Sequence, residues 1–315
     1  MIAALAGGVG AARFLAGLIR AVDPATITAI VNTADDEEFL GLHVSPDLDS
    51  VTYTLGGVSD VVQGWGLAGE SFRTIEAAAR FGEPTWFRLG DLDIATHLFR
   101  TRRLHEGATL AEITTEIAAA FELGLHLVPM TNDRVRTRVT ITTDDGTDEL
   151  AMQEWFVRER CAPPVQSVRF DGAESAAPAP GVLEALRDAD TIIVCPSNPV
   201  ISIGPILAVP GVRDALEAAR DRVVAVSPLI SGRAVKGPAD RMLDALGIET
   251  SCVGVARLYA DWCTTIVIDE QDATQADAIA ALGVRPVVTD TLMRDARVAA
   301  AKTAPAADAA ATTES

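Results

Sequence analysis

The chain has 315 residues, of which 49% are hydrophobic, and its 44 acidic and 26 basic residues give a formal net charge of −18. This length permits one large α/β domain, alone or with a small companion, and so acidic a surface disfavours nucleic-acid binding because it repels a phosphate backbone. No run of 18 apolar residues occurs and no basic segment precedes the first apolar run, so we expect no membrane span, no signal peptide and a cytoplasmic location.

The beginning of the chain has the order of a doubly wound α/β fold. Residues 2–6 form a short apolar run that predicts a buried strand, residues 7–10 form a glycine-rich turn, and residues 11–22 have helical periodicity. A second apolar strand is predicted over 28–31. Strand, glycine turn, helix and strand in this order begin a mostly parallel sheet.

Residues 61–127 have a different pattern, because apolar positions such as Ile75, Ile113 and Ile117 recur at helical spacing. Strands and helices alternate again in the second half, after a hairpin whose first strand is predicted over 135–143. The predicted strands there are 165–170, 191–195, 223–226, 252–255 and 264–268, and the predicted helices are 211–220, 239–246 and 273–282.

The sequence therefore predicts an α/β protein with a Rossmann-like, doubly wound, mostly parallel sheet and a small helical subdomain. We place the nucleotide-binding core at 1–60 and 128–298, the helical insertion at 61–127, and a disordered tail, rich in Ala and Thr, at 299–315. The four cysteines lack metal-binding spacing, so we expect buried, reduced thiols rather than a zinc site or disulfides.

The first segment that could bind a ligand is the glycine turn after the first predicted strand. Gly7, Gly8 and Gly10 let a backbone approach a phosphate closely, and the helix that follows offers free amides. The dinucleotide fingerprint needs a third glycine, and Arg13 stands there instead, which weakens a nicotinamide interpretation. The alternative is a tight strand-to-helix turn with no ligand.

A group of acids follows the second predicted strand: Asp35, Asp36, Asp47 and Asp49. Clustered carboxylates repel one another unless a cation bridges them, so the pattern favours a divalent-metal site or a general base. If the segment is locally extended, Asp47 and Asp49 point to one side, and we expect Asp49, helped by Asp47 or Asp36, at the reacting centre. An acid here could instead hold a ribose, or the segment could be only a solvated acidic loop.

Two further segments suit a flat or anionic ligand. Trp86, Phe87 and Arg88 place aromatic rings beside a guanidinium, although core aromatics before a capped helix would look the same. Prolines flank Ser197 and Asn198 and make this loop rigid, which suits the binding of a base or a phosphate. The alternative is a plain turn, which the two prolines make less attractive.

Taken together and in this order, these segments resemble the 2-phospho-L-lactate transferase family of deazaflavin coenzyme F-420 biosynthesis. The resemblance covers about residues 1–295 and rests on the segments ALAGGVGAARFL, VNTADDEEFLGLHVSPDLDSVTYTLGG, WFRLGDLDIATHLFRT, MTNDRVRT and CPSNPVISIGPIL. No GxSxG or P-loop motif occurs and the histidines lack metal spacing, so a hydrolase or a P-loop kinase has little support.

The resemblance implies a transferase that moves a phosphoenolpyruvyl or 2-phospholactyl group from a guanosine diphosphate-activated donor to the ribityl hydroxyl of the 5-deazaflavin Fo, with release of GMP. It also implies Mg²⁺ as cofactor, small-molecule substrates only, and a homodimer. By matching motif, Asp49 and Arg88 fall at the deazaflavin site, and the glycine turn and the Ser197-Asn198 loop fall at the nucleotide. The predicted site residues are Asp49 and Asp47 for catalysis, Asp49 and Arg88 for the deazaflavin, Gly7, Gly8, Gly10, Thr33, Asp35, Ser197 and Asn198 for the nucleotide, and Asp49 and Asp36 for the metal.

Two alternatives stay open. A nucleotide-sugar-binding regulator of the gluconeogenesis-factor type shares a glycine-rich opening and an acidic loop, but the segments SPDLDS and WFRLGDLD argue against it. A nicotinamide dehydrogenase is disfavoured by Arg13. The donor acid is also open; the arginine-rich, lysine-poor composition is typical of a GC-rich bacterium and favours phosphoenolpyruvate.

Overall fold

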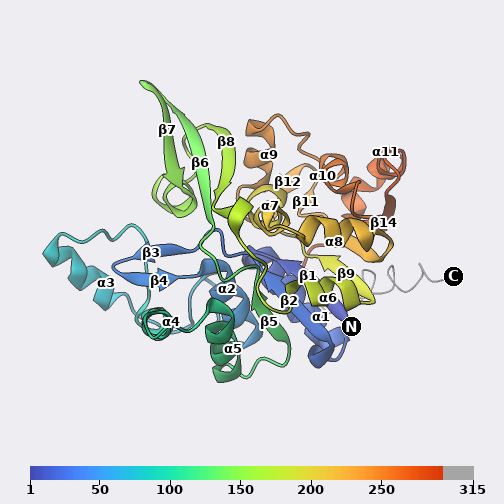
Figure 1. Ribbon diagram of the computed structural model, residues 1–315. Helices are drawn as coiled ribbons and strands as arrows, with labels where there is room; N and C mark the ends of the chain where they lie inside the picture. Colours follow the sequence, from blue (N-terminus) through green and yellow to red (C-terminus); the bar gives the residue numbers. More distant parts are fainter. Residues whose placement is uncertain (294–315) are drawn as a thin grey trace.

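A seven-stranded parallel sheet forms the centre of the computed structural model, which describes residues 1–293 (Figure 1). The strand order is β14-β13-β10-β9-β1-β2-β5. The chain therefore places β2 and β5 on one side of β1, and β9, β10, β13 and β14 on the other side of β1. The strands are β1 (Ile2–Ala6), β2 (Ile27–Val31), β5 (His126–Pro129), β9 (Thr191–Val194), β10 (Val223–Val226), β13 (Thr265–Asp269) and β14 (Arg285–Thr289).

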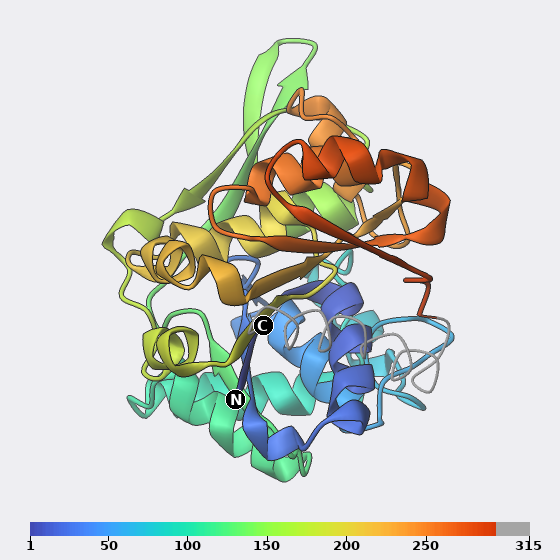
Figure 2. The same ribbon diagram turned by 90° about the vertical axis from the view of Figure 1, so that its right-hand side faces the viewer.

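Helices cover both faces of this sheet, which is why its strands are short, continuously apolar runs (Figure 2). One hydrophobic core joins the strands to α1 (Gly8–Ala21), α2 (Pro46–Leu55) and α5 (Leu110–Ala120). The core on the other face includes α6 (Val182–Asp188), α7 (Gly204–Ala208), α8 (Val212–Ala218), α9 (Ala239–Ala245), α10 (Cys252–Tyr259) and α11 (Ala276–Ala280).

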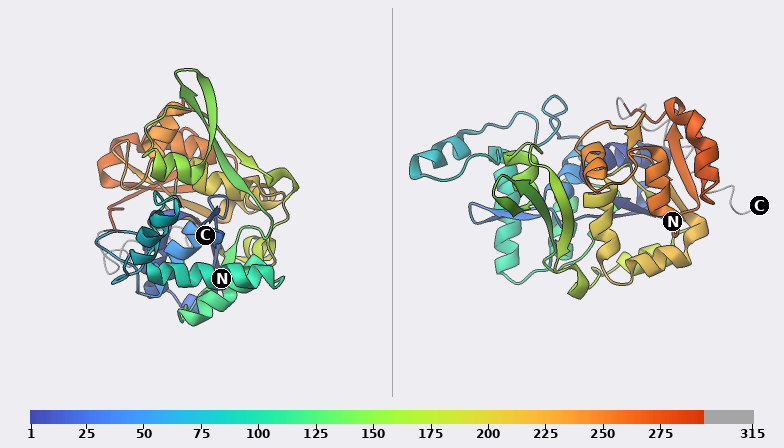
Figure 3. Two further views of the ribbon diagram at one scale, coloured as in Figure 1. Left: turned by 90° about the vertical axis from the view of Figure 1, so that its left-hand side faces the viewer. Right: turned by 90° about the horizontal axis from the view of Figure 1, so that it is seen from above.

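Two hairpins, β3–β4 and β11–β12, and a three-stranded sheet lie outside the central sheet. Figure 3 shows α3 and the hairpin β3–β4 reaching away from the sheet on the side opposite the carboxyl-terminal helices. An antiparallel sheet has the order β7-β6-β8. The bounds are β3 (Glu37–Phe39), β4 (Leu42–Val44), α3 (Arg73–Ala78), α4 (Asp91–His105), β6 (Arg136–Thr143), β7 (Gly146–Ala151), β8 (Val165–Asp171), β11 (Leu229–Ile230) and β12 (Arg233–Ala234).

The predicted fold class is confirmed, but two predicted elements are wrong. Residues 46–55 form the helix α2, so Asp47 and Asp49 lie in neither an extended segment nor a loop, because a proline at the first helical position and two acids in the first turn favour a helix start. Residues 252–255 belong to α10 instead of a strand, because the Ser251 side chain accepts a hydrogen bond from the Gly254 amide and caps a helix there.

Several other expectations concern organisation. The division at 61–127 stays a prediction; within that range α5 packs against the main sheet, whereas Ile75 of α3 belongs to a small separate cluster. The predicted tail at 299–315 lies outside the described residues. All four cysteines are free and three of them are buried.

No single helix of the described residues is both long and apolar enough to cross a membrane. The bent pair Pro199–Ala208 and Val212–Ala218 reaches that length and composition only jointly, and its apolar side chains are packed in the core with α6 and α10.

Candidate active site

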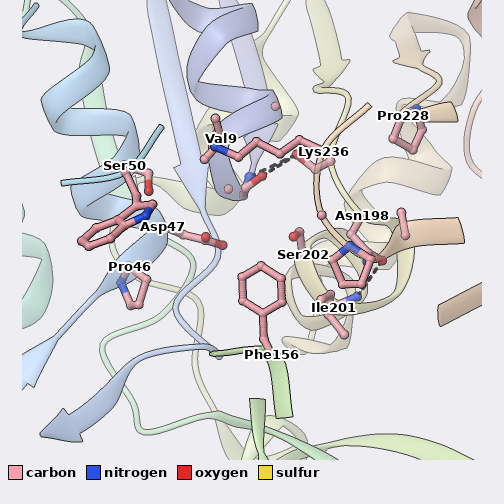
Figure 4. Close-up of a pocket in the computed structure, with 18 of the residues that line it drawn as sticks. Val9, Pro46, Asp47, Ser50, Phe156, Asn198, Ile201, Ser202, Pro228 and Lys236 are labelled. Carbon is pink, nitrogen blue, oxygen red and sulfur yellow. Dashed lines mark hydrogen bonds between the residues drawn. The ribbon is translucent and has the colours of Figure 1, made fainter. Parts of the chain in front are cut away.

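A cavity of about 850 Å³ opens at the carboxyl edge of the sheet (Figure 4). It is lined by residues that follow four central strands: Gly7 after β1, Asp35 after β2, Pro196 after β9 and Ser227 after β10. The strands β1 and β9 are the neighbours at which the winding direction reverses, and open α/β sheets bind ligands at this point.

Gly7 and Gly10 are glycines because residues of α2 and of the loop after β9 occupy the space that their side chains would need. A Cβ at Gly7 would lie 2.9 Å from Oδ2 of Asp47, and one at Gly10 would collide with the carbonyl oxygen of Pro196. The Ser197 hydroxyl donates to the Gly7 carbonyl (2.9 Å) and accepts from the Gly7 amide (3.2 Å). Ser197 therefore fixes the turn at the edge of the cavity, which both residues line.

Asn198 lines the same cavity and has an unused donor. Its Oδ1 accepts from the amides of Val200 (2.9 Å) and Ile201 (3.3 Å), which begins the π-helical turn Pro199–Ile203. Its Nδ2 is buried and has no hydrogen-bond partner among the described residues. A buried donor without a partner is costly, so Asn198 is well placed to bind an acceptor atom of a ligand.

Two acids line the cavity, and neither forms a salt bridge within residues 1–293. Asp47 accepts from Nδ2 of Asn32 (2.9 Å) and from the Gly8 amide. Burial raises the pKa of Asp47 to about 6, the Asn32 hydrogen bond opposes this, and the charge of Asp36 adds to it. Burial and then the charge of Asp47 raise the pKa of Asp35 well above its ordinary value.

Thr33 and Asp36 line a second, smaller cavity of about 320 Å³. There Oδ2 of Asp36 lies 2.9 Å from Nε2 of His43 and accepts a hydrogen bond from the Ser45 hydroxyl (2.8 Å). The structure thus places these two residues apart from the cavity that Asp35 lines. Their predicted roles in nucleotide and metal binding stay predictions.

Asp49 lies only two residues from Asp47 but in a different environment. In a helix two residues correspond to about 200° of rotation, and Asp49 is not among the described residues that line the larger cavity. Arg100 donates two hydrogen bonds to its carboxylate, and Nδ1 of His97 lies 3.6 Å from it. The expectation that Asp47 and Asp49 point to one side is wrong because the segment is helical.

A buried polar network therefore joins α2 to α4. The Tyr53 hydroxyl donates to Oδ1 of Asp93 (2.7 Å), and Nε2 of His97 lies 3.2 Å from the same oxygen. Asp49, Asp93 and His97 bring metal-ligand atoms within 4.8 Å of one another, but the guanidinium of Arg100 already neutralises Asp49. Burial alone would lower the pKa of Arg100, but the adjacent charge of Asp49 holds this pKa above its usual value.

Arg88 lines the cavity together with aromatic side chains. The rings of Trp86 and Phe87 meet at a centroid distance of 5.7 Å, and the guanidinium carbon of Arg88 lies 4.0 Å from the centroid of the Phe72 ring. Within the described chain no salt bridge pairs Arg88 with an acid. Flat rings beside an unpaired guanidinium suit a heterocycle that carries carbonyl oxygens.

The predicted site residues do not include several side chains that line the cavity, among them Arg13, Trp65, Phe156 and Lys236. In the sequence Arg13 only replaces the third glycine of a fingerprint, and no motif surrounds Lys236. Phe156 lies in a π-helical turn after β7 that no local pattern marks as part of a site. Figure 4 shows its ring directed into the space near Ser202 and Asp47.

Similarity to known proteins is extensive. A family model described as 2-phospho-L-lactate transferase CofD matches residues 2–305. Proteins named phosphoenolpyruvate transferase are similar to the chain: that of Streptomyces griseus is 44% identical over 306 residues, covering 95% of each chain. That of Thermobifida fusca is 45% identical over 310 residues (95% and 96%), and that of Mycobacterium ulcerans is 42% identical over 305 residues (91% and 93%).

Solved structures support the fold. A crystal structure of protein BH3568 from Bacillus halodurans superposes with a TM-score of 0.61 at 19% identity, covering 100% of this chain and 99% of that one. A second structure of that protein, described as a member of the upf0052 family, gives a TM-score of 0.57 at 18% identity, covering 100% and 98%. At this identity the likeness shows a shared α/β architecture and no shared activity.

Proposed function

Because the chain belongs to the 2-phospho-L-lactate transferase CofD family and is a transferase, we propose that it moves a phosphoenolpyruvyl group from a guanosine diphosphate ester to the ribityl hydroxyl of a 5-deazaflavin. The observation that carries the proposal is one cavity that combines a glycine turn, an unpaired amide donor on Asn198, an aromatic wall with Arg88, and the ionisable Asp47. Phosphoenolpyruvate is favoured over phospholactate because the relatives at about 44% identity carry that name.

The transfer is one substitution at phosphorus. The acceptor oxygen forms a bond to the phosphorus that carries the enol ester, and the bond from that phosphorus to the bridging oxygen breaks, so GMP leaves with the bridging oxygen. The hydroxyl proton goes to a carboxylate. Asp47 suits this role because it lines the cavity and its raised pKa of about 6 makes it a better proton acceptor than an ordinary aspartate while leaving it ionised at neutral pH.

The donor is assigned to the side of the cavity where loops from β1 and β9 meet. The turn at Gly7 and Gly8 brings backbone close to a ligand, and the helix α1 begins there, so its amino-terminal dipole favours a diphosphate. The free Nδ2 of Asn198 can donate to a phosphate or base oxygen. Positioning and charge neutralisation of this kind are the main requirements of phosphoryl transfer.

The acceptor is assigned to the aromatic wall. Trp86 and Phe87 give a deazaflavin ring flat apolar surfaces, and Arg88 can donate to its carbonyl oxygens. The predicted contribution of Asp49 to acceptor binding is proposed to act through α2, since Arg100 holds Asp49 while Ser50 of the same helix lines the cavity.

Magnesium fits the acids of the larger cavity. Asp35 and Asp47 line it, their proximity raises the pKa of Asp35, and Oδ1 of Asp35 has no hydrogen-bond partner within residues 1–293. Asp35 is therefore proposed as the principal protein ligand, ahead of the predicted Asp36 and Asp49, each of which is already bonded to basic or hydroxyl groups, while Asp47 stays free to accept the proton. When bound, Mg²⁺ would offset the negative charge of the diphosphate.

Mass spectrometry of the product tests the proposal. With the enolpyruvyl guanosine diphosphate ester, Fo and Mg²⁺, the expected products are GMP and an Fo phosphodiester that carries an enolpyruvyl group. Turnover of only the phospholactyl donor, giving a product two hydrogens heavier, would overturn the choice of acid. Tight NAD binding without any deazaflavin binding would overturn the proposed function.

A further inference from the structure

Lys236 connects two parts of the cavity wall that are distant in sequence. It follows the short hairpin β11–β12, and its Nζ donates a 2.7 Å hydrogen bond to the carbonyl oxygen of Gly64. Gly64 and Lys236 both line the larger cavity, and Figure 4 shows Lys236 on the same side of it as Val9 of the glycine turn. The lysine therefore stands where the donor side of the cavity meets the segment around Gly64.

The charges around Lys236 favour an anion. Arg13 of α1 lines the same cavity, and burial followed by the charge of Arg13 lowers the pKa of Lys236. Neither cation forms a salt bridge with an acid in the described part of the chain. An ammonium group has three N–H donors, and Gly64 uses one of them. Two neighbouring cations repel each other, and an anion that binds both removes this repulsion.

The segment that accepts the hydrogen bond carries part of the aromatic wall. Trp65 directly follows Gly64, lines the cavity, and packs against Phe72 at a centroid distance of 5.9 Å. Phe72 in turn supports the guanidinium of Arg88 at 4.0 Å. A shift of the Gly64 carbonyl would therefore be passed to the side chains that the proposed acceptor contacts.

We propose that Lys236 couples the two substrates: its ammonium binds the diphosphate of the donor beside Arg13 while keeping its hydrogen bond to Gly64, so the donor fixes residues 58–72 in the arrangement that binds the deazaflavin. This inference rests on the proposed function. In this proposal Lys236 binds the donor directly. It does not contact the acceptor but positions the residues that bind it.

The test is a pair of binding titrations with the full chain in Mg²⁺, using GDP as the donor-side probe and the fluorescence of Fo as the acceptor-side probe. Saturating GDP should tighten Fo binding to wild type by about tenfold, within the usual range of coupling between sites. Lys236→Met should weaken GDP binding by about tenfold or more and bring the coupling close to one, while Fo binding without GDP changes little.

Two further variants separate the roles. Arg233→Met removes one positive charge from the hairpin that precedes Lys236, at a position that does not line the cavity, so GDP affinity and coupling should stay at wild-type values. Gly64→Ala keeps the ammonium charge, but its methyl group would meet Nζ at 2.5 Å, so coupling should fall by a larger factor than GDP affinity does.

The outcomes are distinguishable. Lys236→Met with wild-type GDP affinity and wild-type coupling, or wild type without coupling, overturns this inference and leaves the proposed function intact. Wild type that binds neither GDP nor Fo overturns the proposed function and this inference together. Unfolding curves of all variants confirm that the compared proteins are folded.

Discussion

Asp47 and Asp49 stand two residues apart on α2, and their side chains are almost equally buried, with 8% and 5% of each residue exposed. Asp47 has amide donors from Asn32 and Gly8, lines the cavity, and has a pKa raised to about 6. Asp49 has the guanidinium of Arg100 as its partner and lies in the network between α2 and α4. Burial therefore does not decide the role of a carboxylate here; the presence of a cation partner does.

Removing Asp49, the partner of Arg100, should have the largest effect on stability. Asp49→Ala leaves the buried guanidinium of Arg100 without its counter-charge, so we expect the free energy of unfolding to fall by about 3–5 kcal/mol. Denaturant unfolding at pH 7.5 measures this loss. Asp47→Ala is the matched control and should lose much less; equal losses would show that the two environments do not differ as described.

The pH dependence of stability should come more from Asp47 than from Asp49. The folded protein holds a proton on Asp47 more tightly than the unfolded chain does, so stability falls as pH rises from about 4 to 6, by up to about 3 kcal/mol for a pKa raised to about 6. Asp35 acts in the same direction. Asp47→Asn should flatten the profile. Burial also raises the pKa of Asp49, with the charge of Arg100 opposing it, so Asp49→Asn should flatten the profile less. An unchanged slope in Asp47→Asn would contradict the assignment.

Magnesium should distinguish the acids of the cavity from Asp49. A cation bound by Asp35 beside Asp47 stabilises the wild type by about 2.7 kcal/mol when its concentration is 100 times the dissociation constant. Thermal unfolding with and without Mg²⁺ at pH 7.5 measures the effect. It should disappear in the double variant Asp35→Asn, Asp47→Asn and persist in Asp49→Asn; persistence in the double variant would move the metal elsewhere.

A smaller effect is expected at the aromatic wall. Arg88→Ala removes a guanidinium that contacts the deazaflavin, so Fo binding should weaken by about 1–3 kcal/mol while GDP binding is retained. Fluorescence titration measures both affinities. Arg80→Ala, on the neighbouring segment but outside the cavity lining, is the control. Equal losses for Fo and GDP in a folded Arg88→Ala protein would contradict the placement.

The sequence predicted the parts of this site that depend on strand ends. Gly7, Asp35, Ser197 and Asn198 follow buried strands, and parallel strands bring their carboxyl ends to one edge. The prediction from the sequence was wrong where the direction of a side chain depends on whether its segment is helical. The acids at 47 and 49 separate for that reason alone.

The contributions of Lys236 and Phe156 could not be predicted because both come from segments far along the chain whose place at the cavity is set by tertiary packing. The partner of Asp49 was hidden for the same reason, since Arg100 is 51 residues away on α4. A turn or a strand end is a local property, whereas a charge pair between two helices is a property of the folded protein.

The most direct test of the role of Asp47 is the kcat of Asp47→Asn and of Asp49→Asn, each divided by the folded fraction in the same buffer with saturating substrates and Mg²⁺. Loss of a proton acceptor should lower kcat of Asp47→Asn on the order of 10²–10⁴-fold, while Asp49→Asn stays within about tenfold of wild type per folded molecule. A near-normal kcat for Asp47→Asn, with a large loss for folded Asp49→Asn, would contradict the assignment of the two acids.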